Sequence, residues 1–127
     1  MALPKANRLK HRQDFDRVYQ RGKRRRASCL HLVALRLSPR PSPEAEDPKV
    51  LPLQIGISIS KKVSKHAVVR NRIKRRIKAA LRQFLPRMTT GWKLVVVVRA
   101  QAVECDYWKF LQELEQLLVE AEVLHGS

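Results

Sequence analysis

The chain has 127 residues, of which 27 are Lys or Arg and 11 are Asp or Glu, so its formal net charge is +16. This length supports a single domain with one modest core, and an apolar content of 44% excludes a disordered tail. So large a positive excess opposes compaction by self-repulsion, which a polyanionic partner would relieve. Nucleic acid is the first candidate for that partner, and an anionic membrane is the second.

The charge is concentrated before residue 100. Residues 1–99 hold 26 basic and five acidic residues, a net +21, whereas residues 100–127 hold one basic and six acidic residues, a net −5. The longest apolar run, Leu94–Val98, is too short to cross a bilayer, and the amino terminus lacks the apolar run of a signal peptide. We therefore expect a soluble, cytoplasmic protein that meets its partner through its first hundred residues.

Metal ligands are not apparent in this sequence. The four histidines have no partner at ligand spacing. Cys29 and Cys105 match no metal-binding pattern and cannot make a disulfide framework, so we expect both to be reduced, small, buried residues.

The first predicted element is a helix from about Arg12 to Arg21. Phe15, Val18 and Tyr19 fall at i, i+3 and i+4, the spacing of one helical face. Gly22 follows as a candidate C′ residue. We expect the basic residues 1–11 before this helix to be flexible.

Two strands and two connections come next. The charge run Lys23–Arg26 is expected to be a solvated loop, and Cys29–Leu37, rich in Leu and Val, predicts a strand. Residues 38–49 contain four prolines and predict an exposed connection within one domain spanning residues 1–127. Leu53–Ser60 alternates apolar and small polar residues, which is typical of a half-buried strand, and a further strand near Val50–Leu53 stays open.

The second half of the chain predicts helix, strand and helix. An apolar stripe at helical spacing runs from Ala67 to about Leu85, where Pro86 ends the helix. The β-branched run within Lys93–Ala100 is suited to a strand covered on both faces. A last helix should extend from Tyr107, capped by Asp106, to about Leu124. The order α-β-β-(β)-α-β-α indicates an α+β fold, arranged as an α/β sandwich.

The helix that follows residue 67 carries the strongest functional signal. It holds five cations within seven residues (Arg70, Arg72, Lys74, Arg75 and Arg76), and no Asp or Glu occurs between Asp47 and Glu104. Like charges at i, i+4 destabilise an isolated helix, whereas phosphates reverse the sign of that effect. A merely solvated basic face is the alternative, but the lack of opposing acidic residues favours contact with nucleic acid.

In this helix and in the segments before it, the sequence resembles the bacterial ribonuclease P protein component. The resemblance lies in Ser58–Val63 followed by Ala67–Arg75, with the core Arg-Asn-Arg-x-Lys-Arg at residues 70–75. Asn7–Lys10 with Asp14-Phe15 and Val18-Tyr19 is similar to that family's opening segment. The resemblance implies an α/β sandwich with a left-handed crossover between the Ile55–Ser60 strand and the strand at residues 94–98. It also implies partnership with a catalytic RNA that removes the 5′ leader of precursor tRNA.

The resemblance also implies roles for individual residues. The expected contacts with the catalytic RNA are Lys61, Lys62, Arg70, Asn71, Arg72, Lys74, Arg75 and Lys78. The expected lining of a cleft for the 5′ leader is Phe15, Tyr19, His31, Val33, Ser58 and Ser60. Aromatic rings beside a sheet face of small residues offer unpaired bases a stacking surface, although Phe15 could equally join the helix to the sheet. Val33 departs from the aromatic residue that some family members carry.

No protein active site is visible in the sequence. A metal-dependent nuclease needs converging carboxylates, and residues 1–99 hold only five acidic residues. We therefore expect no catalytic and no metal-binding residue here, with Mg²⁺ acting in the RNA-containing holoenzyme. Ribonuclease P RNA and precursor tRNA are the expected partners, and neither DNA nor a membrane is expected. The alternatives are a structural RNA-binding protein, such as a ribosomal protein, and an enzyme with its own active site.

Overall fold

A computed structural model of the chain describes residues 3–37 and 52–124. Its elements, in chain order, are η1 (Lys5–Asn7), α1 (Arg12–Arg21), β1 (Lys23–Arg26), β2 (Leu30–Arg36), β3 (Leu53–Ser58), α2 (Ala67–Phe84), η2 (Leu85–Arg87), β4 (Trp92–Val98), η3 (Ala100–Glu104) and α3 (Tyr107–Glu120). The α+β class is confirmed, and the helix from Arg12 to Arg21 has the expected bounds. The possible strand near Val50–Leu53 and the connection 38–49 fall mainly or wholly outside the described residues.

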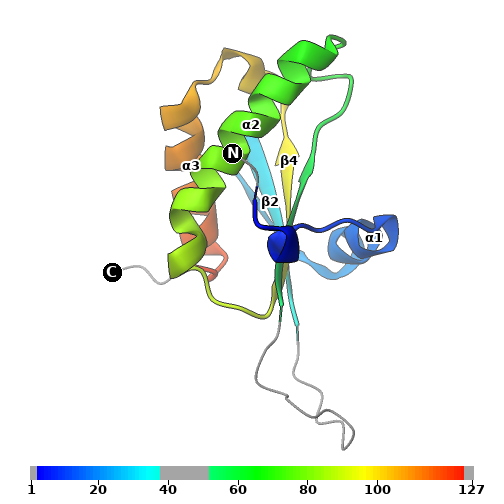
Figure 1. The fold of residues 1–127 in the computed structure, drawn as a ribbon, viewed down its shortest axis with the longest axis vertical. Helices are drawn as coiled ribbons and strands as arrows, with labels where there is room; N and C mark the ends of the chain where they lie inside the picture. Colours follow the sequence, from blue (N-terminus) through cyan, green and yellow to red (C-terminus); the bar gives the residue numbers. More distant parts are fainter. Residues whose placement is uncertain (1–2, 38–51, 125–127) are drawn as a thin grey trace, which may run out of the picture.

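The four strands form one sheet in the order β1-β2-β4-β3. β2 is antiparallel to both of its neighbours, whereas β3 and β4 are parallel and are joined through α2. Helices α2 and α3 pack together on one face of the sheet, and α1 lies alone on the other (Figure 1). The pairing confirms a βαβ crossover between β3 and β4, and its left hand stays a prediction.

Each face of the sheet has its own core. The larger core fills the space between the sheet and the α2–α3 layer, where β2, β4, α2 and α3 contribute fully buried side chains that include Leu30, Leu32, Leu94, Ile77, Leu81, Phe110 and Leu114. The smaller core lies under α1 and consists of Leu9, Val18, Val33 and Val95. Successive residues of a strand point to opposite faces, so β2 and β4 serve both cores.

The expected loop at Lys23–Arg26 is wrong, because these residues form the edge strand β1. A strand without apolar residues has no hydrophobic period to reveal it, and lysine or arginine along an exposed edge discourages pairing with other chains. Gly22 does follow α1, but its backbone is extended (φ −75°, ψ 156°). Glycine fits there because a Cβ would lie 2.6 Å from the Val18 carbonyl oxygen and 2.8 Å from Cγ1 of Val33.

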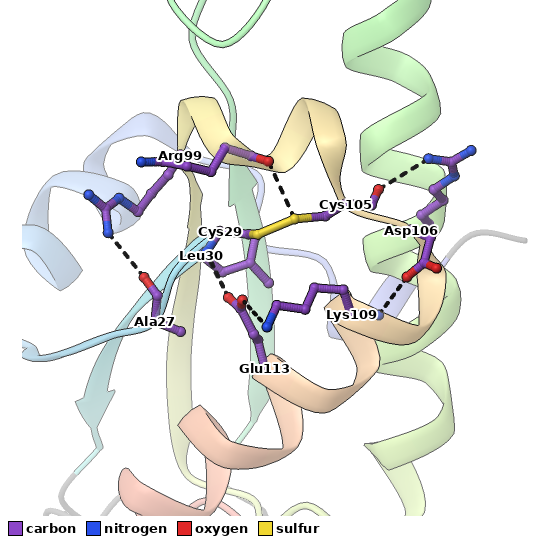
Figure 2. Close-up of a disulfide and its surroundings, with 10 residues drawn as sticks. Ala27, Cys29, Leu30, Arg99, Cys105, Asp106, Lys109 and Glu113 are labelled. Carbon is purple, nitrogen blue, oxygen red and sulfur yellow. Dashed lines mark hydrogen bonds and ion pairs between the residues drawn. A yellow bond between two sulfur atoms is a disulfide. The ribbon is translucent and has the colours of Figure 1, made fainter.

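The prediction of two reduced cysteines is also wrong, because Cys29 and Cys105 form a disulfide between the start of β2 and the residue after η3 (Figure 2). Their 76-residue separation hides a proximity that only the fold creates. Beside them Glu113 of α3 is 3% exposed. Its Oε1 accepts hydrogen bonds from the backbone N–H groups of Cys29 (2.9 Å) and Leu30 (3.2 Å), so this carboxylate attaches α3 to the start of β2.

The amino-terminal segment is not free within the described residues, contrary to expectation. Leu3 and Leu9 are buried. The backbone N–H of Leu9 donates to the Ile55 carbonyl (3.0 Å), and the Asn7 side chain donates to the Leu53 carbonyl (2.8 Å). These bonds hold residues 3–9 along β3. No helix in the described part of the chain is long and apolar enough to span a membrane.

Candidate nucleic-acid interface

Helix α2 separates an anchoring face from a cationic one. Its apolar stripe, Ile73, Ile77, Ala80, Leu81 and Phe84, is buried in the larger core. The opposite face exposes Asn71, Arg72 and Arg75 to solvent. Burial of the stripe holds these three side chains in place without using their polar groups. The helix therefore offers guanidinium and amide donors to an external anion.

Two other arginines of α2 have partners inside the protein. The Nη1 atom of Arg70 donates to the Ser64 carbonyl at 2.8 Å, and that of Arg76 donates to the Cys105 carbonyl at 3.3 Å. Both side chains are half-buried. Arg70 therefore braces the turn before α2, and Arg76 braces the junction with α3. Each guanidinium keeps further donors, but part of each arginine's role is structural.

Lys74 and Lys78 lie on the side of α2 that faces the amino-terminal segment. They line a hollow of ≈ 160 Å³ together with Leu3, Arg8, Leu9, Phe15, Ile55, Gly56 and Ile57. The structure thus brings two predicted RNA contacts of α2 together with Phe15, which was assigned to the leader cleft. Cations on one wall and an aromatic ring on another suit a phosphate and a base of one strand.

The turn after β3 carries Lys61 and Lys62, both exposed. The backbone N–H of Lys62 donates to the Ser60 hydroxyl at 3.3 Å, and Val63 is buried beneath the turn. Anchored in this way, the two lysines lie between the end of β3 and the start of α2. The predicted catalytic-RNA contacts therefore belong to one continuous stretch of chain.

On the opposite face of the sheet, α1 packs on β2 and β4, and its Phe15 reaches Gly56 of β3. A Cβ on Gly56 would lie 2.4 Å from Cζ of Phe15, so the phenyl ring rests directly on the glycine. Phe15 and Tyr19 are half-buried and pack against the smaller core. Val33 belongs to that core and is 0% exposed, so it is inaccessible to RNA in this structure. The close packing on Gly56 supports the alternative reading of Phe15 as a structural residue, while its partial exposure leaves an edge accessible.

One line of residues crosses the whole sheet on the α1 face. Ser58 pairs with Val97, Val97 with His31, and His31 with Arg26. We call Ser58, Val97, His31 and Arg26 the cross-strand row. None of the four is buried, whereas Gly56, Val95 and Val33 in the neighbouring row are, because α1 covers them. The row is thus an open shelf beside α1, and it contains two of the predicted cleft residues.

His31 stands in a positively charged environment. Its pKa is lowered below 6.5 by burial first, and then by the charges of Arg99, Arg26 and Arg24. Its Nε2 atom is buried and has no hydrogen-bond partner among the described residues. The imidazole is therefore neutral at neutral pH, and the positive charge of this shelf comes from arginines that the sequence analysis did not assign. The charge run at Lys23–Arg26 was the available signal, but its interpretation as a loop concealed which of its side chains lie on the α1 face of the sheet.

The described residues contain no group of three or more His, Cys, Asp or Glu side chains that could hold a metal ion. Asp14 is engaged by Lys93 (3.0 Å), an ion pair that fixes α1 to β4. The buried carboxylate of Glu113 is engaged by backbone N–H groups. These carboxylates hold elements together and do not converge on a common point.

Comparison with known proteins agrees with this geometry. A family model described as Ribonuclease P matches residues 3–122. This chain belongs to that family. The ribonuclease P protein component of Microcystis aeruginosa is 52% identical over 126 residues, covering 99% of each chain, and that of a Synechocystis strain is 44% identical.

Solved structures of the family share the fold. The ribonuclease P protein of Staphylococcus aureus superposes with a TM-score of 0.77 at 26% identity, covering 95% of this chain and 100% of that one. The protein from Thermotoga maritima gives a TM-score of 0.70 at 23% identity, which supports the fold alone. The arrangement of four strands and three helices is therefore that of ribonuclease P proteins.

Proposed function

We propose that this chain, as the protein subunit of ribonuclease P, binds the catalytic RNA and the 5′ leader of precursor tRNA. The observation that carries the proposal is the exposed cationic face of α2, which lies on a helix anchored by its apolar stripe and has no acidic residue. Membership of the ribonuclease P family supplies the identity of the RNA partner. A protein in this role is expected to act in the cytoplasm.

The two RNAs use different faces. The catalytic RNA binds the solvent-facing side of α2 through Asn71, Arg72 and Arg75, with Lys61 and Lys62 beside them. Planar guanidinium groups can grip two phosphate oxygens each, and the Asn71 amide can contact sugar or base edges. The leader follows the α1 face, where Tyr19 and the accessible edge of Phe15 offer stacking surfaces. Lys74 and Lys78 lie between the two faces and can serve either RNA.

Hydrolysis takes place on the RNA subunit in this proposal. Mg²⁺ held by that RNA would supply the Lewis-acid chemistry of the hydrolysis, and this chain's residues would not bind it. The protein holds the leader strand and lowers the repulsion between two polyanions by placing cations at their junction. Asp14 and Glu113 are engaged within the fold, by Lys93 and by backbone N–H groups respectively, which fits this supporting role.

The test is reconstitution. The purified protein is added to a bacterial ribonuclease P RNA and a precursor tRNA at low magnesium, where RNA alone cleaves slowly. We expect the wild type to raise the cleavage rate, and the double variant Arg72→Ala/Arg75→Ala to raise it far less. If the wild type leaves the rate unchanged, the proposal fails, and a structural role in another RNA–protein particle becomes the better account.

A second measurement addresses the leader. Tyr19→Leu keeps an apolar side chain against the smaller core but removes the ring on which a base can stack. It should weaken binding of precursor tRNA to the holoenzyme by about tenfold, as expected for roughly 1–3 kcal/mol of stacking per base. Mature tRNA should bind as before. Equal losses for both tRNAs would contradict a leader contact at Tyr19.

A further inference from the structure

Strand β1 is the least expected part of the fold. All four of its residues, Lys23, Arg24, Arg25 and Arg26, are cationic, and it forms the outer edge of the sheet farthest from β3. A solvated edge explains why β1 is charged, but not to which face of the sheet each charged side chain points. The pairing with β2 determines that direction.

Residues directly opposite each other in an antiparallel pair point to the same face of the sheet. Arg24 is opposite Val33, and Arg26 is opposite His31. Val33 lies in the small core beneath α1, so Arg24 and Arg26 project onto the α1 face. Lys23 and Arg25 project onto the other face, which α3 covers. The strand therefore divides its four charges equally between the two faces.

Arg99 brings a third guanidinium to the same end of the sheet. Its backbone N–H donates to the Cys29 carbonyl at 2.9 Å, and its Nη1 donates to the Ala27 carbonyl at 3.1 Å (Figure 2). These bonds fix the residue after β4 against the turn between β1 and β2. Arg24 is oriented similarly, because its Nη2 donates to the Tyr19 carbonyl at 3.3 Å.

The three arginines lie at the His31 end of the cross-strand row: Arg26 is opposite His31, Arg24 is two residues along β1 on the same face, and Arg99 is bonded to Ala27, the residue after β1. Each contributes to lowering the pKa of His31. The acidic residues of α1 do not offset them: Asp14 is paired with Lys93, which lies four residues along β4 from Val97, and Asp16 is exposed. Neutral His31 adds no charge of its own. A cluster of this kind is stabilised when an anion binds beside it.

We propose that Arg24, Arg26 and Arg99 form a phosphate clamp for the upstream part of the precursor-tRNA leader. This inference rests on the proposed function, because the cross-strand row connects the clamp with the α2 side of the sheet. The row spans three strand spacings, about 14 Å at roughly 4.8 Å each. A single strand that enters beside Lys74 and Ser58 crosses β4 and β2 and meets the clamp at the β1 edge. The clamp therefore acts only on leaders long enough to cross the sheet.

The test compares two double variants of the same strand. Arg24→Ala/Arg26→Ala removes two charges from the α1 face, and Lys23→Ala/Arg25→Ala removes two charges from the other face as a matched control. Each is assembled with ribonuclease P RNA and titrated with precursor tRNAs whose leaders have about ten or about two nucleotides. These lengths are chosen because protein sites for single strands cover roughly 4–16 nucleotides, so only the longer leader can fill one. Circular dichroism and thermal unfolding confirm that both variants fold.

The expected loss follows from counterion release. Two lost phosphate contacts on a single strand reduce the slope of log affinity against log salt by about 1.4, which corresponds to roughly a tenfold loss at 0.15 M salt. We expect this loss for Arg24→Ala/Arg26→Ala with the long leader only, and an unchanged slope for the control variant.

Three results would overturn or separate the claims. Equal losses with both leaders would mean that these arginines bind the catalytic RNA, which overturns the clamp. Unchanged binding of the long-leader substrate by Arg24→Ala/Arg26→Ala would also overturn the clamp. If the wild type itself does not distinguish long from short leaders while Arg72→Ala/Arg75→Ala still loses RNA binding, the clamp and the leader cleft fail, and the catalytic-RNA interface stands.

Discussion

The assignment of α2 as the catalytic-RNA contact predicts a specific electrostatic signature. In Arg72→Ala/Arg75→Ala, two exposed guanidinium groups are lost, while the buried stripe of Ile73 and Ile77 is untouched. If each arginine neutralises one phosphate of structured RNA, the slope of log affinity against log salt falls by about 1.8. At 0.15 M salt this corresponds to a loss of affinity of about 30-fold. Alanine favours helix, so the fold should be retained.

The assay is equilibrium binding to ribonuclease P RNA over a range of salt concentrations. Arg76→Ala is the matched control, because it removes the same charge from the same helix but from a side chain that bonds the Cys105 carbonyl. It should lower the free energy of unfolding by about 1 kcal/mol. It should also reduce the slope of log affinity against log salt by less than Arg72→Ala or Arg75→Ala does alone. A double variant whose slope equals that of the wild type would refute the assignment of this face, whatever its affinity.

Three further predictions concern the fold around the interface. Gly56→Ala should destabilise the protein by about 1–3 kcal/mol in urea unfolding, because its Cβ would collide with Phe15 and displace α1; a neutral result would show that α1 adjusts freely. Glu113→Ala should cost about 2–3 kcal/mol by leaving two N–H groups unpaired, and Glu113→Gln should recover part of it. Because the pKa of His31 is lowered in the folded protein, the unfolded chain binds more protons than the folded protein just below pH 6.5. The contribution of His31 to stability is therefore full above pH 6.5, declines as the pH falls below it, and stops declining once the lowered pKa is reached. His31→Gln should flatten that part of the profile, and an unchanged profile would contradict the shift.

The parts of the fold that the sequence predicted well are those with a strong hydrophobic period. Helix α2 was expected from Ala67 to about Leu85 and ends at Phe84, because its stripe and Pro86 leave little choice. The last helix ends at Glu120 rather than near Leu124. Val123 and Leu124 are buried, so their apolar pattern reflects packing beyond the helix end. A hydrophobic period thus predicts which residues are buried more directly than it predicts where a helix ends.

The missed features depend on partners that are distant along the chain. Strand β1 exists because β2 lies beside it, and nothing in a run of four cations indicates that neighbour. The disulfide depends on the fold bringing η3 to the start of β2. For Val33, the pattern correctly predicted a strand, but its exposure depended on where α1 docks. Local pattern reports the period of an element, whereas the element's neighbours determine which of its side chains a ligand can reach.

The arginines show why charge alone does not define an RNA interface. Arg70 and Arg76 bond backbone carbonyls of the protein, Arg72 and Arg75 are exposed, and Arg24 does both, since it is exposed and donates to the Tyr19 carbonyl. A guanidinium with five donors can be oriented by one protein bond and still present the others to phosphate. An arginine fixed in this way loses less conformational entropy on binding than a free one. Partial engagement within the protein is therefore compatible with RNA contact, and the salt slope, rather than exposure, distinguishes a brace from a contact.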